Sequence, residues 1–137
     1  MIDLIKWPEL DFKGQTVFFD CLPTPKPTMT HADRWKQRRC VIHYREYCDL
    51  LRTLAMKHRF RLGDAYRVIF YIPVSESWSM KKKREHVGLM HQETPDVDNL
   101  LKALNDSLRP GDDKRIWTCP PYKFWSWTPG IAIQNLI

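Results

Sequence analysis

Apolar residues recur along the chain with two different periods, one typical of β-strands and one typical of α-helices. Four segments are rich in β-branched and aromatic residues and are bounded by proline, glycine or polar residues, which is typical of strands. These segments are 15–22, 65–73, 116–119 and 130–137. The second has the clearest signal, because Pro73 ends it sharply. We therefore predict a sheet of about four strands.

Two further segments repeat apolar residues at steps of three and four, which predicts amphipathic helices. The first runs from about Asp33 to Arg59. The second begins near Asp96; its predicted core-facing stripe is Val97, Leu101, Leu104 and Leu108, and its opposite side is Asp98, Lys102 and Asn105. Together these elements predict an α/β fold, with a small mixed β-sheet of about four strands packed against two main helices.

Two segments between these elements are open to two interpretations each. Residues 75–84 are polar and then densely basic, so they predict a loop or the frayed start of a helix. They could serve as a solubilising run, or as an arm that grips phosphates with Trp78 available to stack on a base. Residues 122–127 are aromatic, and we favour a hairpin that packs its rings inward over a base-stacking platform.

The composition indicates one packed domain spanning residues 1–137, without repeats or a flexible linker. The hydrophobic share is 43% and there are six Trp, which is typical of a globular protein and not of a disordered chain. No apolar run approaches the roughly 20 residues that cross a bilayer, so we expect no membrane partner. The first ten residues lack the apolar core of a signal peptide, so we predict a cytoplasmic location.

Charge and cysteine spacing narrow the choice of partners. The 22 Lys and Arg against 16 Asp and Glu leave a net charge of +6, which favours a polyanion such as DNA or RNA. The four cysteines show no C-x-x-C spacing, so we expect buried free thiols and no zinc site.

Carboxylates are concentrated between residues 96 and 113. Asp96 and Asp98 lie at a predicted helix start, and Asp112 and Asp113 follow a Pro-Gly turn after that helix. Structural roles account for each of them singly: an N-cap, an ion pair between Asp98 and Lys102, and two turn residues. Their concentration in a basic, aromatic chain indicates instead a magnesium site for cutting nucleic-acid phosphodiesters.

Magnesium fits this set of side chains. Mg²⁺ prefers oxygen ligands, binds through few carboxylates and keeps waters that can become a nucleophile. Asp96 and Asp98, with one of Asp112 and Asp113, could hold one or two ions. Lys102 would then neutralise charge on the scissile phosphate or its leaving oxygen.

A calcium-binding EF-hand loop is a competing interpretation of the segment that begins at Asp96. Such a loop needs Gly at its sixth position and Glu at its twelfth. The chain has Leu101 and Ser107 at these positions, which excludes an EF-hand.

A longer motif surrounds the aspartates. It reads Pro95-Asp96-x-Asp98-Asn99-Leu100-x-Lys102, then Asp106-x-Leu108, then Asp112-Asp113-x-x-Ile116. Upstream lie Pro23-x-Pro25-Lys26-Pro27, the Ser-Trp-Ser-x-Lys-Lys-Lys run and His91, and downstream lie Lys123 and the run from Pro129 to Ile133. In this pattern, over roughly residues 17–135, the chain resembles the RusA family of Holliday junction resolvases, especially its phage-borne members.

The resemblance implies a small α/β homodimer that makes paired, Mg²⁺-dependent nicks across a four-way DNA junction, with Mn²⁺ able to substitute. By position, Asp96, Asp98 and Asp113 correspond to the family's metal-binding catalytic aspartates. Lys102 corresponds to its catalytic lysine, and Asp112 ranks as a fourth candidate ligand. The implied location is the cytosol of a bacterium or of a phage-infected host, and the implied task is DNA recombination and repair.

The chain departs from the family pattern in two places. Thr94 stands where the family usually has Lys or Arg before Pro-Asp. The spacing of Asp98 and Asp113, 113 − 98 = 15, is about three residues short of the usual pattern. The choice between Asp112 and Asp113 therefore stays open.

Basic residues around the acidic segment are predicted to grip the DNA backbone, so that binding weakens steeply with salt. The candidates are Lys26, Arg34, Lys36, Arg38, Lys81, Lys82, Lys83, Arg84 and Lys123. Two rival functions remain open. One is a non-catalytic module that binds branched DNA or RNA, and the other is a nuclease of the same chemistry for flaps, forks or RNA hairpins.

Overall fold

The computed structural model describes residues 6–35 and 38–137. Its elements along the chain are β1 (Thr16–Phe19), η2 (His31–Arg34), α1 (Arg39–Lys57), β2 (Tyr66–Pro73), α2 (Met80–His86), α3 (Val97–Leu108), η3 (Asp113–Arg115), β3 (Pro121–Ser126) and β4 (Gly130–Asn135). None of the helices in these ranges is long and apolar enough to cross a membrane.

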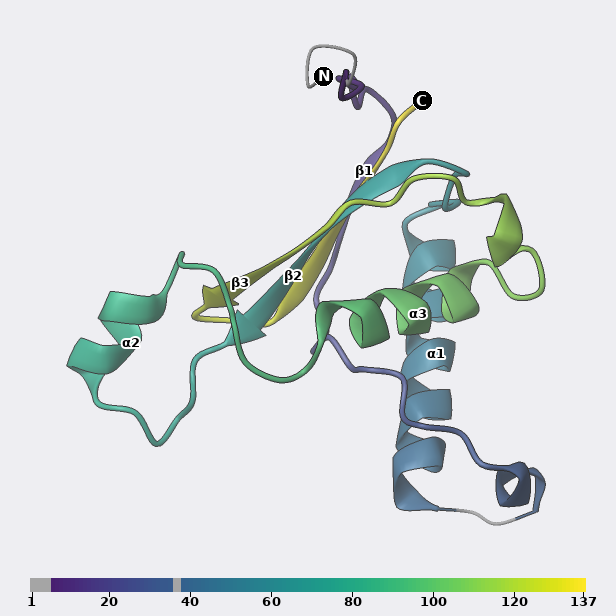
Figure 1. Ribbon diagram of the computed structural model, residues 1–137. Coiled ribbons are helices and arrows are strands. Elements are labelled where there is room, and N and C mark those ends of the chain that lie inside the picture. The colour runs from purple at the N-terminus through teal and green to yellow at the C-terminus, as the bar shows by residue number, and fades with distance from the viewer. Residues whose placement is uncertain (1–5, 36–37) are drawn as a thin grey trace.

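The four strands form one mixed sheet in the order β1-β4-β2-β3. The β1–β4 and β4–β2 pairs are antiparallel, and β2–β3 is parallel. Both α1 and α3 lie on the same side of this sheet, whereas α2 lies beyond its end (Figure 1). The predicted fold, a mixed sheet of four strands with two main helices, is confirmed.

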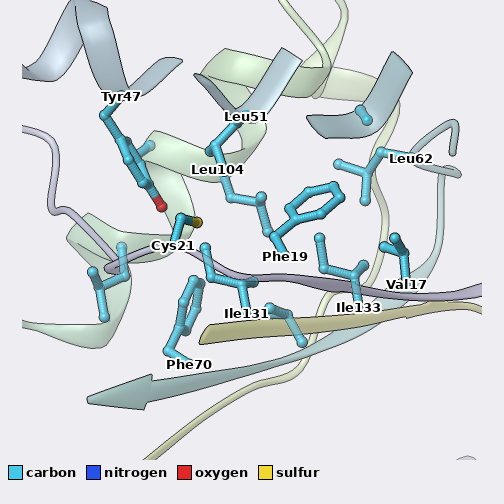
Figure 2. Packing of buried hydrophobic residues seen from close by; sticks show 14 of the residues in the cluster. Val17, Phe19, Cys21, Tyr47, Leu51, Leu62, Phe70, Leu104, Ile131 and Ile133 are labelled. Carbon is cyan, nitrogen blue, oxygen red and sulfur yellow. The ribbon is translucent and has the colours of Figure 1, made fainter. Parts of the chain in front are cut away.

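Strand alternation builds the core between the sheet and the two helices. Every second residue of β2, from Tyr66 to Ile72, is buried, and the residues between them are more exposed. Phe19 and Ile131 extend the same inner face across the sheet, where they meet Leu51 of α1 (Figure 2). The core therefore fixes which side of each strand faces the helices, and hence which side chains reach α3.

The predicted aromatic hairpin at residues 122–127 is wrong in its pairing. Tyr122 pairs with Ile69 on one side of β2, and Ala132 pairs with Ile69 on the other. Because β2 separates β3 from β4, the turn between them crosses the end of β2. One ring, that of Trp125, packs inward, whereas Tyr122 is half-exposed on the opposite face.

The predicted strand at residues 116–119 is reduced to one isolated bridge with its flanking backbone hydrogen bonds. Thr118 makes an isolated parallel bridge to Ala65, and regular pairing begins only at Pro121. The two consecutive prolines that follow Cys119 thus stand at the entrance of the strand and not beyond its end.

The first helix is shorter than predicted. A 3-10 turn (η2) precedes it, and α1 begins at Arg39 instead of near Asp33. The Asp33 carboxylate accepts hydrogen bonds from the Thr30 amide (2.6 Å) and from the Arg38 guanidinium (2.7 Å). These contacts hold a separate turn before the helix. The helix ends at Lys57, because Arg59 has a left-handed φ of 50°.

The basic run from residue 80 forms the short helix α2 where the sequence predicted a loop or a frayed start. Ser79 caps it by accepting a hydrogen bond from the Lys82 amide (3.2 Å). The Trp78 ring lies under the Lys82 ammonium at 4.2 Å and 4.9 Å from the Trp125 ring. A cap and an aromatic anchor therefore offset the repulsion among the adjacent cations.

The core-facing side of α3 is rotated from the predicted stripe. Its buried residues are Leu100, Ala103, Leu104 and Ser107, and the predicted Val97, Leu101 and Leu108 flank them, partly buried. Asn105 does not join Asp98 on the solvent side, because it accepts a hydrogen bond from the hydroxyl of buried Tyr66. The buried face of α3 includes the small residues Ala103 and Ser107, which the prediction from large apolar residues left out.

All four cysteines are free thiols, as expected. Cys21 and Cys48 are buried, and burial raises the pKa of Cys21 to about 11. The other two depart from the prediction of buried thiols, because Cys40 is exposed and Cys119 is half-buried.

Candidate active site

Asp96 lies at the start of α3, and its carboxylate makes no capping hydrogen bond. It is the N-cap residue, in the extended conformation (φ −68°, ψ 141°) that this position requires. An N-cap carboxylate ordinarily accepts a hydrogen bond from an amide of the first helical turn. The Asp96 side chain is exposed and accepts no such bond within the described residues. Its oxygens are therefore available to a cation.

Asp98 lies in the first turn of the same helix and is also accessible. Its nearest cation is Lys102, whose Nζ is 3.7 Å from the Asp98 Oδ2. Both side chains are about two-thirds exposed, at 66% for Asp98 and 62% for Lys102. A long contact between two solvated side chains contributes little to stability. The pair is therefore free to rearrange around a ligand.

Lys123 of β3 contributes a second positive charge, after Lys102, at this end of α3. Its Nζ donates hydrogen bonds to the carbonyl oxygens of Glu93 (2.6 Å) and Pro95 (2.7 Å). Burial lowers the pKa of Lys123 from its usual value, and the nearby Asp96 carboxylate opposes part of that shift. The sequence predicted a DNA contact for this residue, whereas the structure places its ammonium against the backbone that leads to Asp96.

The segment before Asp96 is docked along the outer edge of β3. The Gly88 amide donates to the Trp125 carbonyl (2.9 Å), and the His91 amide donates to the Lys123 carbonyl (3.0 Å). The buried His91 ring packs 4.2 Å from the Trp125 ring. Burial, and then the charge of Lys123, lower the pKa of His91. These contacts give the approach to α3 a fixed path over the strand.

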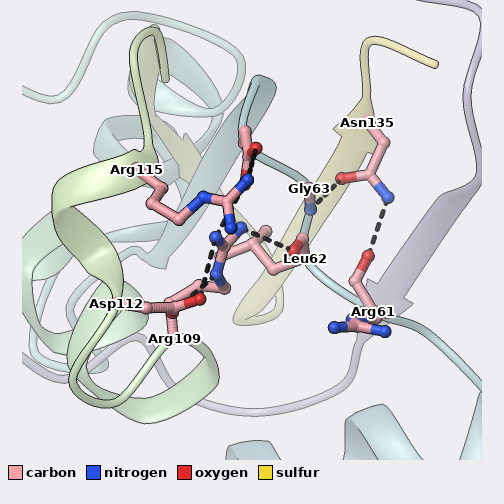
Figure 3. A network of polar contacts seen from close by, with 8 residues as sticks. Arg61, Leu62, Gly63, Arg109, Asp112, Arg115 and Asn135 are labelled. Carbon is pink, nitrogen blue, oxygen red and sulfur yellow. Dashed lines mark hydrogen bonds and ion pairs between the residues drawn. The ribbon is translucent and has the colours of Figure 1, made fainter.

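Asp112 and Asp113 lie at the opposite end of α3 and differ in their environments. Both oxygens of Asp112 accept hydrogen bonds from the Arg109 guanidinium, at 2.9 and 3.2 Å (Figure 3). Arg109 also donates to Asp64 (2.6 Å) and to the Leu62 carbonyl (3.1 Å). The Arg109 guanidinium lowers the pKa of Asp112. Asp112 thus belongs to a structural network that ties the end of α3 to the loop before β2.

Asp113 is exposed at the start of η3, and its carboxylate makes no hydrogen bond or ion pair with the described residues. Of the two candidates that the sequence left open, Asp113 is therefore the one whose oxygens remain available to a ligand.

One chain does not bring all the predicted carboxylates together. Asp96 and Asp98 lie at the start of α3, whose 12 residues span about 18 Å at 1.5 Å per residue, and Asp113 lies beyond the other end of this helix. Across residues 6–35 and 38–137, no group of three or more His, Cys, Asp or Glu side chains is positioned to share a metal ion. A single chain therefore presents two separate acidic sites, a pair at one end of α3 and Asp113 at the other.

Two of the predicted DNA-binding cations have internal partners. Lys26 Nζ lies 2.5 Å from Asp106 Oδ2, which also accepts a hydrogen bond from the Tyr44 hydroxyl (3.2 Å). Arg38 forms a two-pronged contact with buried Asp33, as described above for the start of α1. Both cations stabilise the fold directly, so their charge is already compensated.

The remaining predicted cations lie mainly on α2. Lys81, Lys82 and Arg84 are exposed, and Lys83 is half-buried. The backbone of Arg34 belongs to η2, and Lys36 lies outside the described residues. Among the predicted DNA-binding cations whose side chains the structure describes, the exposed ones without an ion-pair partner therefore lie on the short helix α2, anchored beside β3.

Sequence reasoning missed the structural roles of Lys123 and Arg109. A signal existed for Lys123. It lies two residues before Trp125 along β3, so both side chains point to the same face of the sheet, and Trp125 is buried there. In the structure Lys123 pairs with Phe70 of β2, which is buried on that face. Such a position predicts an internal partner for a lysine. No comparable pattern marks Arg109, whose partners Asp64 and Leu62 are more than forty residues away.

Fold and site together define a small, basic α/β protein with an exposed carboxylate pair and flanking lysines at a helix start, a set suited to phosphodiester chemistry. A family model, Endodeoxyribonuclease RusA, matches residues 19–134. The chain belongs to this family of endonucleases that resolve Holliday junctions. No curated protein and no solved structure matches the chain in the other two comparisons.

Proposed function

We propose that this protein is a Mg²⁺-dependent endodeoxyribonuclease that resolves Holliday junctions by paired hydrolysis of phosphodiesters, in DNA recombination and repair. The observation that carries the proposal is that the carboxylates of Asp96 and Asp98 are exposed and lack close structural partners within the described residues. Asp96 occupies a capping position without capping, and Asp98 has only a long, solvated contact with Lys102. Within the described residues neither carboxylate is held by a close structural contact, so both can turn toward a cation.

The residues at the start of α3 suit a hard divalent cation. Two exposed carboxylates supply oxygen ligands, and Mg²⁺ commonly binds through one or two carboxylates together with substrate phosphates. When bound, Mg²⁺ supplies Lewis acidity toward water and phosphate oxygens. Lys102, one turn beyond Asp98, would offset negative charge on the scissile phosphate. Mn²⁺, with similar ligand preferences, should support the same reaction.

We further propose that the active enzyme is a homodimer. A four-way junction has two equivalent strands to cut, and a two-fold dimer presents two equivalent sites. Asp113 lies about one helix length from the carboxylate pair of its own chain. An antiparallel approach of two α3 helices would place Asp113 of one copy beside Asp96 and Asp98 of the other. The two acidic ends of one chain would then become two complete sites in the dimer.

The backbone of the junction would be gripped by α2. Its exposed cations are not used by internal ion pairs within the described residues, unlike those of Lys26 and Arg38. Trp78 lies beneath Lys82, so it supports the helix and is not presented for base stacking on that side. Binding should accordingly depend on phosphate contacts and weaken steeply with salt.

The deciding experiment is cleavage of a labelled synthetic four-way junction, with and without Mg²⁺, by the wild type and by Asp98→Asn. We expect paired, symmetric nicks that need the metal and fall at least about 100-fold in the variant, because removing one charged group from such a site typically costs that much. Tight binding without any cutting in Mg²⁺ or Mn²⁺ would contradict the proposal and leave a junction-binding module. Flaps, forks and RNA hairpins tested in parallel would reveal a different preferred substrate.

A further inference from the structure

The Lys123 side chain is the most constrained cation near the candidate site. The residue is half-buried, and its ammonium group donates to two backbone carbonyls, Glu93 O at 2.6 Å and Pro95 O at 2.7 Å. These carbonyls stand on either side of Thr94, and Pro95 directly precedes Asp96. A single side chain from β3 therefore fastens the last residues before the metal-binding candidate.

The backbone of Lys123 is itself fixed from both sides. On one side it pairs with Phe70 of β2, whose side chain is fully buried. On the other side its carbonyl accepts a hydrogen bond from the amide of His91 (3.0 Å), in the segment that leads to Asp96. The strand thus provides a rigid base, and the lysine side chain reaches from this base across to the start of α3.

Building on the proposed nuclease function, we propose that Lys123 is a positioning residue for Asp96 and not a DNA-binding residue. It holds the carbonyls before α3, so that the Asp96 carboxylate keeps one orientation relative to Asp98. The same ammonium places a positive charge near Asp96, which reduces the mutual repulsion of the two carboxylates before a cation binds. Without it, both carbonyls would need water and the segment would become mobile.

The alternative role for this lysine is the phosphate contact that its charge alone suggests, and the two roles have different consequences. A phosphate-gripping lysine contributes to junction affinity and to its salt dependence, with a slope change of about 0.9 for one lost contact. A positioning lysine contributes to the rate of the bound complex and to its Mg²⁺ requirement. Geometry favours positioning, because two of the three ammonium N–H bonds already point at backbone oxygens.

The test compares Lys123→Met with Lys123→Arg, and uses Lys57→Met as a matched control. Lys57 is exposed in the last turn of α1, so the control removes the same charge at a position outside the site. With enzyme in excess, we expect Lys123→Met to slow cleavage of a four-way junction about 100-fold and to raise the Mg²⁺ concentration for half-maximal rate. Junction affinity without metal, and its salt slope, should match those of the control. Lys123→Arg should recover about tenfold of the rate, since it keeps the charge and the donors.

A second measurement does not depend on cleavage. In the free protein, amide hydrogen exchange of residues 93–100 should become faster in Lys123→Met, while the strands β2 and β4 keep their protection. This outcome would support positioning even if the wild type cut no DNA, so failure of the nuclease proposal and failure of this inference are distinguishable. The inference is overturned if Lys123→Met leaves exchange unchanged at residues 93–100. It is equally overturned if Lys123→Met binds the junction more weakly without metal and with a smaller salt slope, while its maximal cleavage rate is unchanged.

Discussion

At the scale of single residues, the neighbours of an aspartate decide what it can do. Asp112 has both oxygens held by Arg109, so its charge is committed to the fold. Asp96, at a position where aspartate usually caps a helix, makes no capping bond within the described part of the chain. Asp113 is likewise exposed and unbonded there. Identical side chains a few residues apart thus separate into a structural group and a group available for chemistry.

This contrast predicts opposite effects for two neighbouring variants. Asp112→Asn should lower the melting temperature at pH 7, because it removes the charged acceptor of a partly buried guanidinium, and should leave cleavage within a few-fold of the wild type. Asp113→Asn should keep the melting temperature and slow junction cleavage about 100-fold or more. Thermal unfolding and single-turnover cleavage, measured on both variants, check the assignment. The reverse pattern would make Asp112 the ligand.

The acid side of the stability profile should report the Asp33–Arg38 contact. Arg38 and the Thr30 amide hold the pKa of Asp33 well below its usual value of 3.8. A carboxyl with a lowered folded-state pKa stabilises the fold above its unfolded pKa, and the contribution is lost as pH falls through the folded value. We therefore expect stability to decline below about pH 4, with a shallower decline in Asp33→Asn. Urea unfolding from pH 2 to pH 7 tests this; equal slopes for both proteins would contradict it.

At the scale of elements, the local sequence pattern predicted the features that local interactions control, namely the positions of strands and of a helix start. Alternation located β1, β2 and β4, since a strand buried on one face repeats every two residues. The acidic pair could be placed at a helix start because Pro95 and Asp96 form a recognisable N-terminal signal. The α3 stripe was misjudged because Ala103 and Ser107 are small, although both are buried.

What the sequence could not predict depends on which side chains meet in the folded chain, whether their positions are near or far apart. The start of α1 is set by Arg38 reaching back to Asp33 across a turn, and the bridge at Thr118 replaces a strand. The ion pair between Lys26 and Asp106 joins residues eighty positions apart, so the charge of this predicted DNA contact is compensated within the fold. Such pairings follow from tertiary geometry, which neither periodicity nor charge count contains.

The short helix α2 should carry much of the salt-dependent affinity for DNA. A variant with Lys81, Lys82 and Arg84 all changed to Gln should lower the slope of log affinity against log salt by about 2.7, at about 0.9 per lost phosphate contact. Cleavage at saturating enzyme should be nearly unchanged, because α2 lies apart from the start of α3, where the carboxylate pair is found (Figure 1). Fluorescence anisotropy of a labelled junction at several salt concentrations measures the slope. An unchanged slope would assign the phosphate contacts to another surface.

At the scale of the whole molecule, one chain places its candidate metal-binding carboxylates at the two ends of a single helix. The carboxylate pair and Lys102 occupy the start of α3, which is about 18 Å long, and Asp113 follows the other end of this helix. The sequence motif predicted these residues as one set, because a linear motif does not record which copy of the chain supplies each ligand. In a two-fold dimer every residue appears twice, so a separation within one chain does not prevent contact between two.

Mixing two inactive variants tests whether the site is shared between copies. Asp98→Asn and Asp113→Asn should each be nearly inactive alone. If Asp113 acts on the carboxylate pair of the other copy, a mixed dimer of the two variants contains one site with both substitutions and one intact site. An equimolar mixture that exchanges subunits should then regain about a quarter of the wild-type sites, since half of its dimers hold one intact site out of two.

The products distinguish this arrangement from simpler ones. Mixed dimers should nick one strand of the junction without the paired second cut, so denaturing gels should show cleavage, whereas native gels show few resolved duplexes. As a control, each variant is first cross-linked as a homodimer and the two are then mixed. This mixture cannot exchange subunits and should stay inactive. No recovery in the exchanging mixture, with both variants inactive alone, would place each working site within one chain.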